Sequence, residues 1–242
     1  MTRLFGANAV LDILDAAPEA IRGILYHGRL DPDGLRVLDR ARKAGLLIRE
    51  VDSEELRQRS GGRGGASVAA DLRVAAAPDP STLDPESQPV IVALDQVTDP
   101  HNLGAIMRSC AAFGVPTVLL PRDNSAPLND AAARASAGAI AHVGVTRVTN
   151  LARTLHDLHE QGYWPCAVSA DAPASAWDTD LASLPLVLVL GAEGAGLRPL
   201  VRKACPLAIR LPMTGLLRSL NVSVAAGITL AEVARQRAKP AR

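Results

Sequence analysis

Residues 186–196 read LVLVLGAEGAG, and this stretch decides the fold that the sequence predicts. Its first five residues form a continuous apolar run that ends at Gly191. Short Val- and Leu-rich runs of this kind are typical of strands buried on both faces of a parallel sheet. Three glycines in residues 191–196 allow a tight turn and a close approach of a ligand to the backbone, with Glu193 between them. The stretch therefore predicts an α/β fold with a turn suited to binding at the end of this strand.

Two polar segments follow this turn. Residues 208–211 predict a second short strand, and residues 219–223, SLNVS, lead into an Ala-rich helix that ends near Arg235. Open α/β sheets bind ligands at the carboxyl ends of their parallel strands, so Glu193, Ser219 and Asn221 are candidate site residues. The alternative is structural: the glycines only turn the chain, Ser219 only caps the helix, and Glu193 is a solvated loop acid. Both interpretations are open on pattern alone.

The remaining sequence divides into three parts. Residues 90–242 alternate strand and helix patterns, which predicts a mainly parallel sheet. Residues 77–89, APDPSTLDPESQP, contain four prolines and predict a semi-extended linker without a packed element. Residues 1–76 predict a small α/β unit in which one helix covers residues 7–17 with Asn8 as its cap, another begins at Asp31 and is closed by Gly45, and a Gly-rich loop covers residues 60–65.

Composition excludes several classes of protein. Aromatic residues make up 2% of the 242 residues, which argues against an RNA surface built from stacking aromatics. The three cysteines form no C-x-x-C pair, no signal peptide opens the chain, and no apolar run is long enough for a membrane helix, so we expect a cytoplasmic protein with no membrane contact. His156 and His159 lie beside acids, but without further ligands they predict a polar helix face and no metal site.

Basic residues gather beside the predicted site. Between Gly194 and Arg218 there is no acid, and the five basic residues are Arg198, Arg202, Lys203, Arg210 and Arg218. The pattern favours either a phosphate-binding patch or a solvated helix face with strand ends.

Four motifs carry a resemblance to a known family. They are DQVTDPHNLGAIMR at residues 95–108, GAEGAG at 191–196, LPMTG at 211–215 and SLNVSVA at 219–225. In this order they resemble the SpoU/TrmH family of RNA ribose 2′-O-methyltransferases. The resemblance implies S-adenosylmethionine as cofactor, a homodimer, and a deep trefoil knot in the C-terminal domain. It also implies cofactor binding at Gly191, Leu211, Met213 and Leu220.

The same resemblance implies that Arg108 is the main catalytic residue, surrounded by Asn102, Glu193, Ser219 and Asn221. A guanidinium scarcely loses its proton in proteins, so we expect Arg108 to stabilise the developing oxyanion and to contact phosphate rather than to act as a base. Glu193 is expected to orient Arg108 through a bidentate ion pair.

The N-terminal unit resembles the small ribosomal-protein-like substrate-binding domain of members that modify ribosomal RNA. The opening FGANAV at residues 5–10 fits that pattern, whereas GGASV at 64–68 replaces the usual His-Gln-Gly-Val. The resemblance favours a guanosine of large-subunit (23S) ribosomal RNA, with Arg59, Arg63, Arg198 and Arg218 as RNA-binding residues. The alternatives are a transfer-RNA 2′-O-methyltransferase, a ribosomal-RNA resistance methyltransferase, and a non-catalytic RNA-binding or ribosome-assembly factor.

Overall fold

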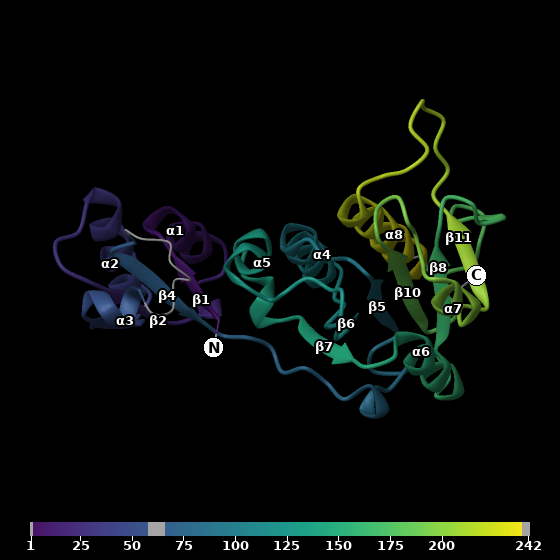
Figure 1. Cartoon of the computed structure of the whole chain (residues 1–242), viewed down its shortest axis with the longest axis horizontal. Coiled ribbons are helices and arrows are strands. Elements are labelled where there is room, and N and C mark those ends of the chain that lie inside the picture. Colours follow the sequence, from purple (N-terminus) through teal and green to yellow (C-terminus); the bar gives the residue numbers. More distant parts are fainter. Residues whose placement is uncertain (1, 58–65, 239–242) are drawn as a thin grey trace.

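Two β-sheets organise the molecule, as Figure 1 shows. The computed structural model describes residues 2–57 and 66–238. A four-stranded sheet in the order β1-β4-β2-β3 lies toward the N-terminus, and a seven-stranded sheet in the order β7-β6-β5-β10-β8-β11-β9 forms the larger part. The expectation of an α/β fold with a mainly parallel sheet is confirmed, since the paired strands of the larger sheet are all parallel.

The seven-stranded sheet has β5 and β10 near its centre. Its strands are β5 (Val90–Asp95), β6 (Thr117–Pro121), β7 (Gly144–Val148), β8 (Trp164–Val168), β9 (Ala174–Ser175), β10 (Leu186–Gly191) and β11 (Leu207–Arg210). Every residue of β5 is buried, and β10 pairs with β5 in register from Leu186–Val90 to Gly191–Asp95. This burial on both faces explains why these strands read as continuous apolar runs in the sequence.

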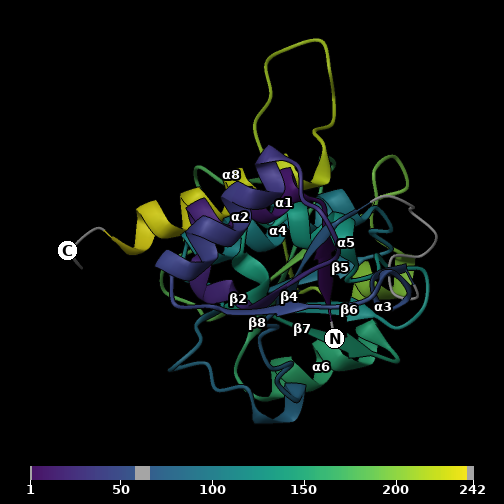
Figure 2. The same cartoon turned by 90° about the vertical axis from the view of Figure 1, so that its left-hand side faces the viewer.

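Helices cover both faces of the larger sheet. They are α4 (Pro100–Ala112), α5 (Asp130–Ala135), α6 (Leu151–Glu160), α7 (Pro199–Lys203), α8 (Val222–Arg237) and the 3-10 turn η3 (Ala139–Ala141). Val92 and Leu94 of β5 join the apolar cluster that includes α4 and α8, whereas Ile91 and Ala93 join the cluster that includes α6 and α7. Figure 2 shows α4 and α8 on one side of the strands and α6 on the other.

The N-terminal unit is a smaller sheet with its own helices. Its elements are β1 (Arg3–Phe5), α1 (Ala7–Ala16), η1 (Pro18–Ala20), β2 (Ile21–Tyr26), α2 (Pro32–Lys43), β3 (Leu47–Glu50), α3 (Ser53–Arg57) and β4 (Val68–Leu72). The expected cap and stop of α2 are confirmed, since the Asp31 carboxylate accepts a hydrogen bond from Gly34 N at 2.7 Å and Gly45 has φ 67°. The expected cap at Asn8 is wrong, because α1 begins at Ala7 after Gly6 and has no side-chain cap.

Residues 77–89 are mostly exposed and irregular, as the linker prediction expects, but they also contain one short turn, one buried side chain and contacts with the larger unit. Pro80–Thr82 form a 3-10 turn, η2, and Leu83 is only 5% exposed. The Thr146 hydroxyl donates to the Pro78 carbonyl at 2.6 Å, and the Tyr163 hydroxyl donates to the Gln88 carbonyl at 3.0 Å. Prolines are compatible with the start of such a turn, because the N–H that they lack has no partner there.

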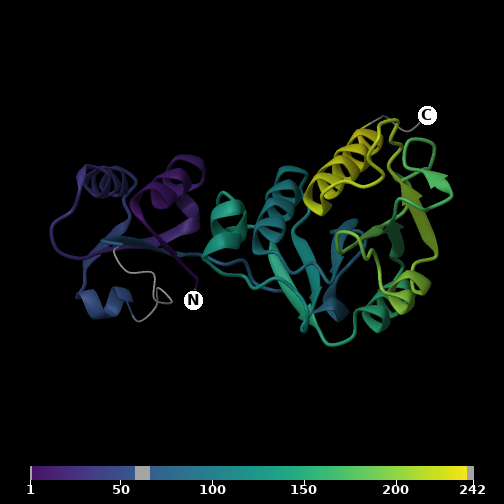
Figure 3. The same ribbon diagram turned by 45° about the horizontal axis from the view of Figure 1, so that its top comes forward.

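The two sheets are joined by direct contacts through α5 and η3, and Figure 3 shows α5, the teal helix labelled in Figure 1, between them. Phe5 N donates to Asp130 Oδ1 at 3.3 Å, and Ala75 N donates to the Ile140 carbonyl at 2.9 Å. One apolar cluster runs from Leu4 and Val10 to Leu94 and Ile106. Because the two parts share some of their apolar core, the division into units at 1–76 and 90–242 stays a prediction.

Gly104 allows α4 to approach α5 closely. A Cβ atom built at Gly104 lies 2.6 Å from Ala135 Cβ and 2.9 Å from Ser136 N, and it also clashes with the Ala132 carbonyl. We expect Gly104→Ala to lower the free energy of unfolding by about 1–3 kcal/mol, because backbone must move to admit the methyl group. Urea denaturation measures the change.

Gly227→Ala is the matched control for this prediction. Gly227 also lies within a helix, α8, and its built Cβ meets only Ser109 Oγ at 3.4 Å. Alanine there should raise stability by about 0.5–1 kcal/mol through helix propensity. Equal effects of the two substitutions would contradict the close approach inferred at Gly104.

Candidate active site

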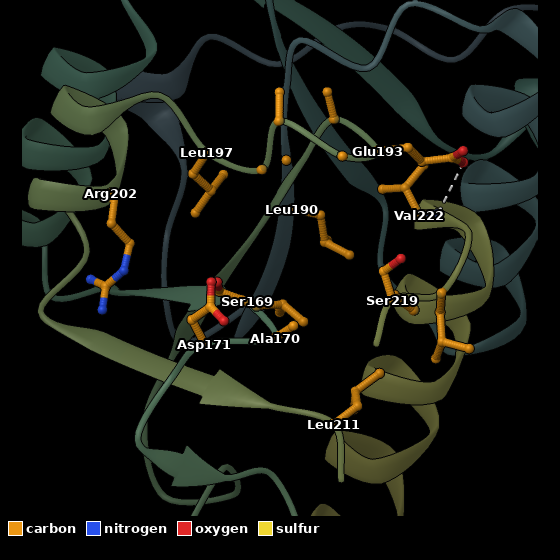
Figure 4. A pocket seen from close by; sticks show the side chains of 18 of the residues that line it. Ser169, Ala170, Asp171, Leu190, Glu193, Leu197, Arg202, Leu211, Ser219 and Val222 are labelled. Atoms are coloured by element: carbon orange, nitrogen blue, oxygen red, sulfur yellow. Dashed lines mark hydrogen bonds between the residues drawn. The ribbon is translucent and has the colours of Figure 1, made fainter. Parts of the chain in front are cut away.

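A cavity opens at the carboxyl ends of β8, β10 and β11 (Figure 4). Its volume is about 540 Å³. Five segments line it: the end of β8 with residues 169–171, the turn at residues 190–197, Arg202 of α7, residues 211–220 in part, and the first turns of α8. The cavity therefore lies where parallel strands of α/β sheets usually bind ligands.

The structure brings most of the expected site residues to this cavity. The four expected cofactor-binding residues all line it: Gly191, Leu211, Met213 and Leu220. Glu193 and Ser219, expected from the catalytic set, line it as well. Gly191 has a steric reason to be glycine, because a built Cβ would lie 2.6 Å from Leu197 N and clash with the Gly196 backbone. The turn folds back on itself so tightly that a side chain at this position has no room.

Three sequence motifs meet at the Glu193 carboxylate. Asn221 Nδ2 donates to Glu193 Oε1 at 2.6 Å, and Asn102 Nδ2 donates to the same oxygen at 3.3 Å. Asn221 Nδ2 also donates to Asn102 Oδ1 at 2.9 Å, and Val222 N lies 3.4 Å from Glu193 Oε1. Glu193 is exposed on the turn, as the interpretation of a solvated loop acid expects, but amide donors from two other elements hold its carboxylate.

Asn221 has a second role at the start of α8. Its Oδ1 accepts hydrogen bonds from Ser223 N at 2.9 Å and from Val224 N at 3.4 Å, so it is the N-cap of the helix. The structural alternative for Ser219 is wrong, because the capping residue is Asn221. One side chain thus fixes the helix with its oxygen and the Glu193 carboxylate with its nitrogen.

Arg108 is exposed on α4, and the expected ion pair with Glu193 is absent. Within residues 2–57 and 66–238, neither a hydrogen bond nor an ion pair engages the Arg108 guanidinium, and Glu193 is held by amides instead. The helical repeat explains this result. Asn102 and Arg108 are six residues apart, so their side chains leave α4 in directions that differ by about 120°. When Asn102 faces Glu193, Arg108 points elsewhere.

The expected RNA-binding arginines have different environments. Arg198 donates through Nε and Nη2 to the buried Asp95 carboxylate at 2.8 and 2.7 Å, so much of its guanidinium is already engaged. Arg218 is exposed on the segment between β11 and α8. Arg59 and Arg63, together with the predicted Gly-rich loop, lie outside the described residues.

The other members of the expected basic patch also differ. Arg210 donates to the Ala172 and Pro173 carbonyls, Arg202 donates to the Cys205 carbonyl at 3.3 Å, and Lys203 is exposed. Hydrogen bonds within the protein hold some of these basic side chains, and others are exposed. The five residues therefore do not form one continuous free surface for phosphate.

Sequence reasoning missed one charged residue of the cavity, Asp171, and placed another, Arg202, only in the basic patch beside the site. Asp171 lines the cavity from beyond the end of β8, and Arg202 lines it from α7, as Figure 4 shows. The rule that identified Glu193, a polar residue just beyond a buried strand, also applies to Asp171, which lies three residues after Val168.

The chemistry available here is binding and positioning. Burial raises the pKa of the Cys110, Cys166 and Cys205 thiols to about 12, so these residues are protonated and unsuited to act as nucleophiles at neutral pH. Among residues 2–57 and 66–238 there is no cluster of side chains that could hold a metal ion, and no helix there could cross a membrane. Amides, a carboxylate and backbone groups remain to orient reactants.

Comparisons with known proteins agree with this arrangement. The model of the SpoU rRNA Methylase family matches residues 89–231. A 23S rRNA (guanosine-2'-O-)-methyltransferase RlmB of Vibrio parahaemolyticus is 37% identical over 239 residues, which cover 97% of this chain and 96% of that protein. The protein of the same name from Xanthomonas campestris is 39% identical over 240 residues, with 97% and 96% covered.

A solved structure is similar over nearly the whole chain. The AdoMet-bound rRNA methyltransferase from Sinorhizobium meliloti aligns with a TM-score of 0.68 and 26% identity, and the alignment covers 97% of this chain and 87% of that one. The family match, the extent of the two sequence relatives and the converging motifs lead to one conclusion: this chain belongs to the SpoU rRNA methylase family.

Proposed function

We propose that this protein transfers a methyl group from S-adenosylmethionine to the ribose 2′-hydroxyl of a guanosine in 23S ribosomal RNA. The observation that carries the proposal is the convergence of Asn102, Glu193 and Asn221 beside a cavity at the strand ends. The two relatives with 37% and 39% identity, which span 97% of this chain, bear the name of that activity.

The cavity has the size and lining for the proposed cofactor. A volume of about 540 Å³ falls within the range of about 300–1,000 Å³ that is usual for small-molecule sites. Apolar side chains of Leu211, Met213 and Leu220 and the backbone at Gly191 would hold S-adenosylmethionine. The bound cofactor would supply a methyl group on a sulfonium sulfur: the ribose oxygen would bond to the methyl carbon, the carbon–sulfur bond would break to leave the neutral thioether S-adenosylhomocysteine, and the hydroxyl proton would pass to solvent. The S. meliloti relative was solved with AdoMet bound, and this supports the assignment.

In the proposed mechanism the protein aligns the reactants and stabilises charge. In-line transfer requires the ribose oxygen and the methyl carbon to be held in one geometry, and holding reactants in this way accelerates the reaction. Glu193, Asn102 and Asn221 form the fixed polar wall of the site, and Ser219 adds a hydroxyl at its edge. Arg108 has no partner in the described part of the chain and does not line the cavity, so its proposed role, to stabilise the developing oxyanion and the adjacent phosphate, rests on the family resemblance.

The proposal includes a homodimer and the knotted topology that the family resemblance implies. Leu216 is fully exposed, and Leu217 is 78% exposed, on a segment that projects from the body of the molecule between β11 and α8 (Figure 1). Val224 on the first turn of α8 is also exposed. Apolar surface gains about 25 cal/mol per Å² when it leaves water, so a second copy covering these side chains would be stabilising. The trefoil knot would be formed by the two turns that flank β11, the last strand of the sequence.

The N-terminal unit is proposed to bind ribosomal RNA in the manner of a small ribosomal-protein-like domain. It carries α1 and α2 against one face of its four-stranded sheet. The two sequence relatives cover 97% of this chain, so the similarity includes this unit. This extent favours ribosomal RNA over transfer RNA as the substrate class.

The two roles of Asn221 can be separated by substitution. Asn221→Ala removes the cap and the donor to Glu193, so we expect the free energy of unfolding to fall by about 1 kcal/mol and methyl transfer to fall at least tenfold. Asn221→Ser keeps a capping oxygen and should recover most of the stability but not the activity. Urea denaturation and single-turnover methylation measure the two effects. A serine variant as active as the wild type would contradict a role for the Asn221 nitrogen.

Arg108 is expected to act on transfer rather than on cofactor binding. Arg108→Ala should lower kcat about 100-fold or more, the usual cost of losing one donor to a developing oxyanion. The dissociation constant of S-adenosylhomocysteine, measured by calorimetry, should stay unchanged. Arg153→Ala, at an exposed arginine of α6, is the matched control and should be fully active. Full activity of the Arg108 variant would refute its catalytic role.

A methylation assay tests the proposed function as a whole. The protein is incubated with tritiated S-adenosylmethionine and separate pools of transfer, small-subunit and large-subunit RNA, and alkali-resistant linkages are mapped. We expect label at one 2′-O-methylguanosine of large-subunit RNA. Label in transfer RNA would overturn the substrate class. Absence of both label and cofactor binding would favour a non-catalytic RNA-binding or assembly factor, and label at another ribosomal nucleotide would favour a resistance methyltransferase.

A further inference from the structure

We propose that Asp95 and Arg198 form a positioning pair that fixes the turn at residues 191–198 in the shape required for cofactor binding. This inference rests on the proposed function. It assigns to Arg198 a role different from the RNA contact that the sequence suggested, and it gives Asp95 a role in the site without contact to the substrate.

Arg198 engages both oxygens of the Asp95 carboxylate. Asp95 is the last residue of β5 and is 0% exposed. Its Oδ2 accepts a hydrogen bond from Arg198 N at 2.8 Å, and its Oδ1 lies 2.8 Å from Arg198 Nε and 2.7 Å from Nη2. A buried carboxylate is costly without such partners, so the main chain and the side chain of Arg198 are both held at this point.

The pair holds the two ends of the turn, Gly191 and Arg198, beside the same residue. Gly191 lies opposite Asp95 in the register of β10 and β5, so the chain leaves the sheet beside Asp95. It returns to the same residue at Arg198, and inside this closure Gly196 N donates to the Ala192 carbonyl at 2.9 Å. Both ends of the turn are therefore anchored at one residue of the neighbouring strand.

The tip of the turn has little packing of its own. Gly194 and Gly196 have φ values of 79° and 68°, and a Cβ built at either meets nothing within 4 Å. Glycine loses more conformational freedom on ordering than other residues do. The Asp95–Arg198 pair adds a constraint at the base of the turn to the packing of Leu197 and the hydrogen bonds of Glu193.

The turn carries functional groups between these anchors. Residues 191–197 line the cavity, and Glu193 within them accepts from Asn102 and Asn221. Asp95 also precedes the loop that leads to the Asp99 cap of α4, the helix that holds Asn102. The pair therefore sits between two loops that meet at Glu193, and its loss should displace the cavity wall and loosen this network.

The test measures cofactor binding without RNA. Asp95→Asn, Arg198→Gln and the double variant are titrated with S-adenosylhomocysteine by calorimetry. We expect each single variant to bind about tenfold more weakly, and the double variant to bind no more weakly than the weaker single variant, because both remove one interaction. In steady-state assays the KM for the cofactor should rise while the KM for RNA stays unchanged.

Two further variants separate this role from general damage and from RNA binding. Lys203→Ala removes an exposed cation from α7 without touching Asp95 and should bind the cofactor as the wild type does. Arg198→Lys keeps the charge but loses the two-pronged geometry, so its affinity should lie between those of wild type and Arg198→Gln. Thermal unfolding of each variant reports whether the fold is retained. Substitutions of Arg198, whose side chain is 44% exposed, should disturb the fold less than substitutions of the buried Asp95.

The outcomes are distinct. Wild-type affinity for S-adenosylhomocysteine in folded Arg198→Gln and Arg198→Lys variants would overturn the inference and leave the proposed function standing. Weaker RNA binding by Arg198→Gln, with unchanged cofactor affinity, would restore the RNA-contact interpretation. Failure of the wild type to bind the cofactor would overturn the proposed function and this inference together.

Discussion

The in-register parallel pairing of β5 with β10 is the interaction on which the site is built. It places Gly191 opposite Asp95 at the carboxyl ends of the two strands. The loops that follow these two residues carry Asn102 and Glu193, which are far apart in the sequence and hydrogen-bonded in the structure. A shift of this pairing by one residue would turn the buried side chains of β10 to the opposite faces and separate the two loops.

The sequence predicts the elements whose patterns are local. Buried strands such as β5 and β10 are visible as Val- and Leu-rich runs, and α2 is visible from Asp31 and Gly45 at its ends. The three residues of β1 are too few to show an alternation, and this strand exists because it pairs with β4. The contacts that tie residues 77–89 to the larger unit could not be predicted, because their partners, Thr146 and Tyr163, lie in distant elements.

The candidate site shows the same division. Motif residues indicate which side chains belong together, and the cavity is lined by residues expected from them, including Gly191, Met213 and Ser219. Motifs do not give angles, so the expected Glu193–Arg108 pair was wrong and the amide contacts to Glu193 were not foreseen. Asp95 illustrates a further limit. A carboxylate at a strand end is a plausible ligand in a sequence, and only its burial and its contacts with Arg198 identify it as a support for the turn.

The shared apolar cluster between the two sheets has a consequence for how an RNA would be selected. Contacts from Phe5 to Asp130 and from Ala75 to Ile140 oppose independent movement of the N-terminal unit. If that unit binds RNA as proposed, these contacts fix the distance, or span, between the RNA-binding surface of the N-terminal unit and the cavity where the ribose is modified. A target would then be chosen because its folded shape presents one ribose at that span, and a chain with few aromatic side chains would need little direct reading of bases.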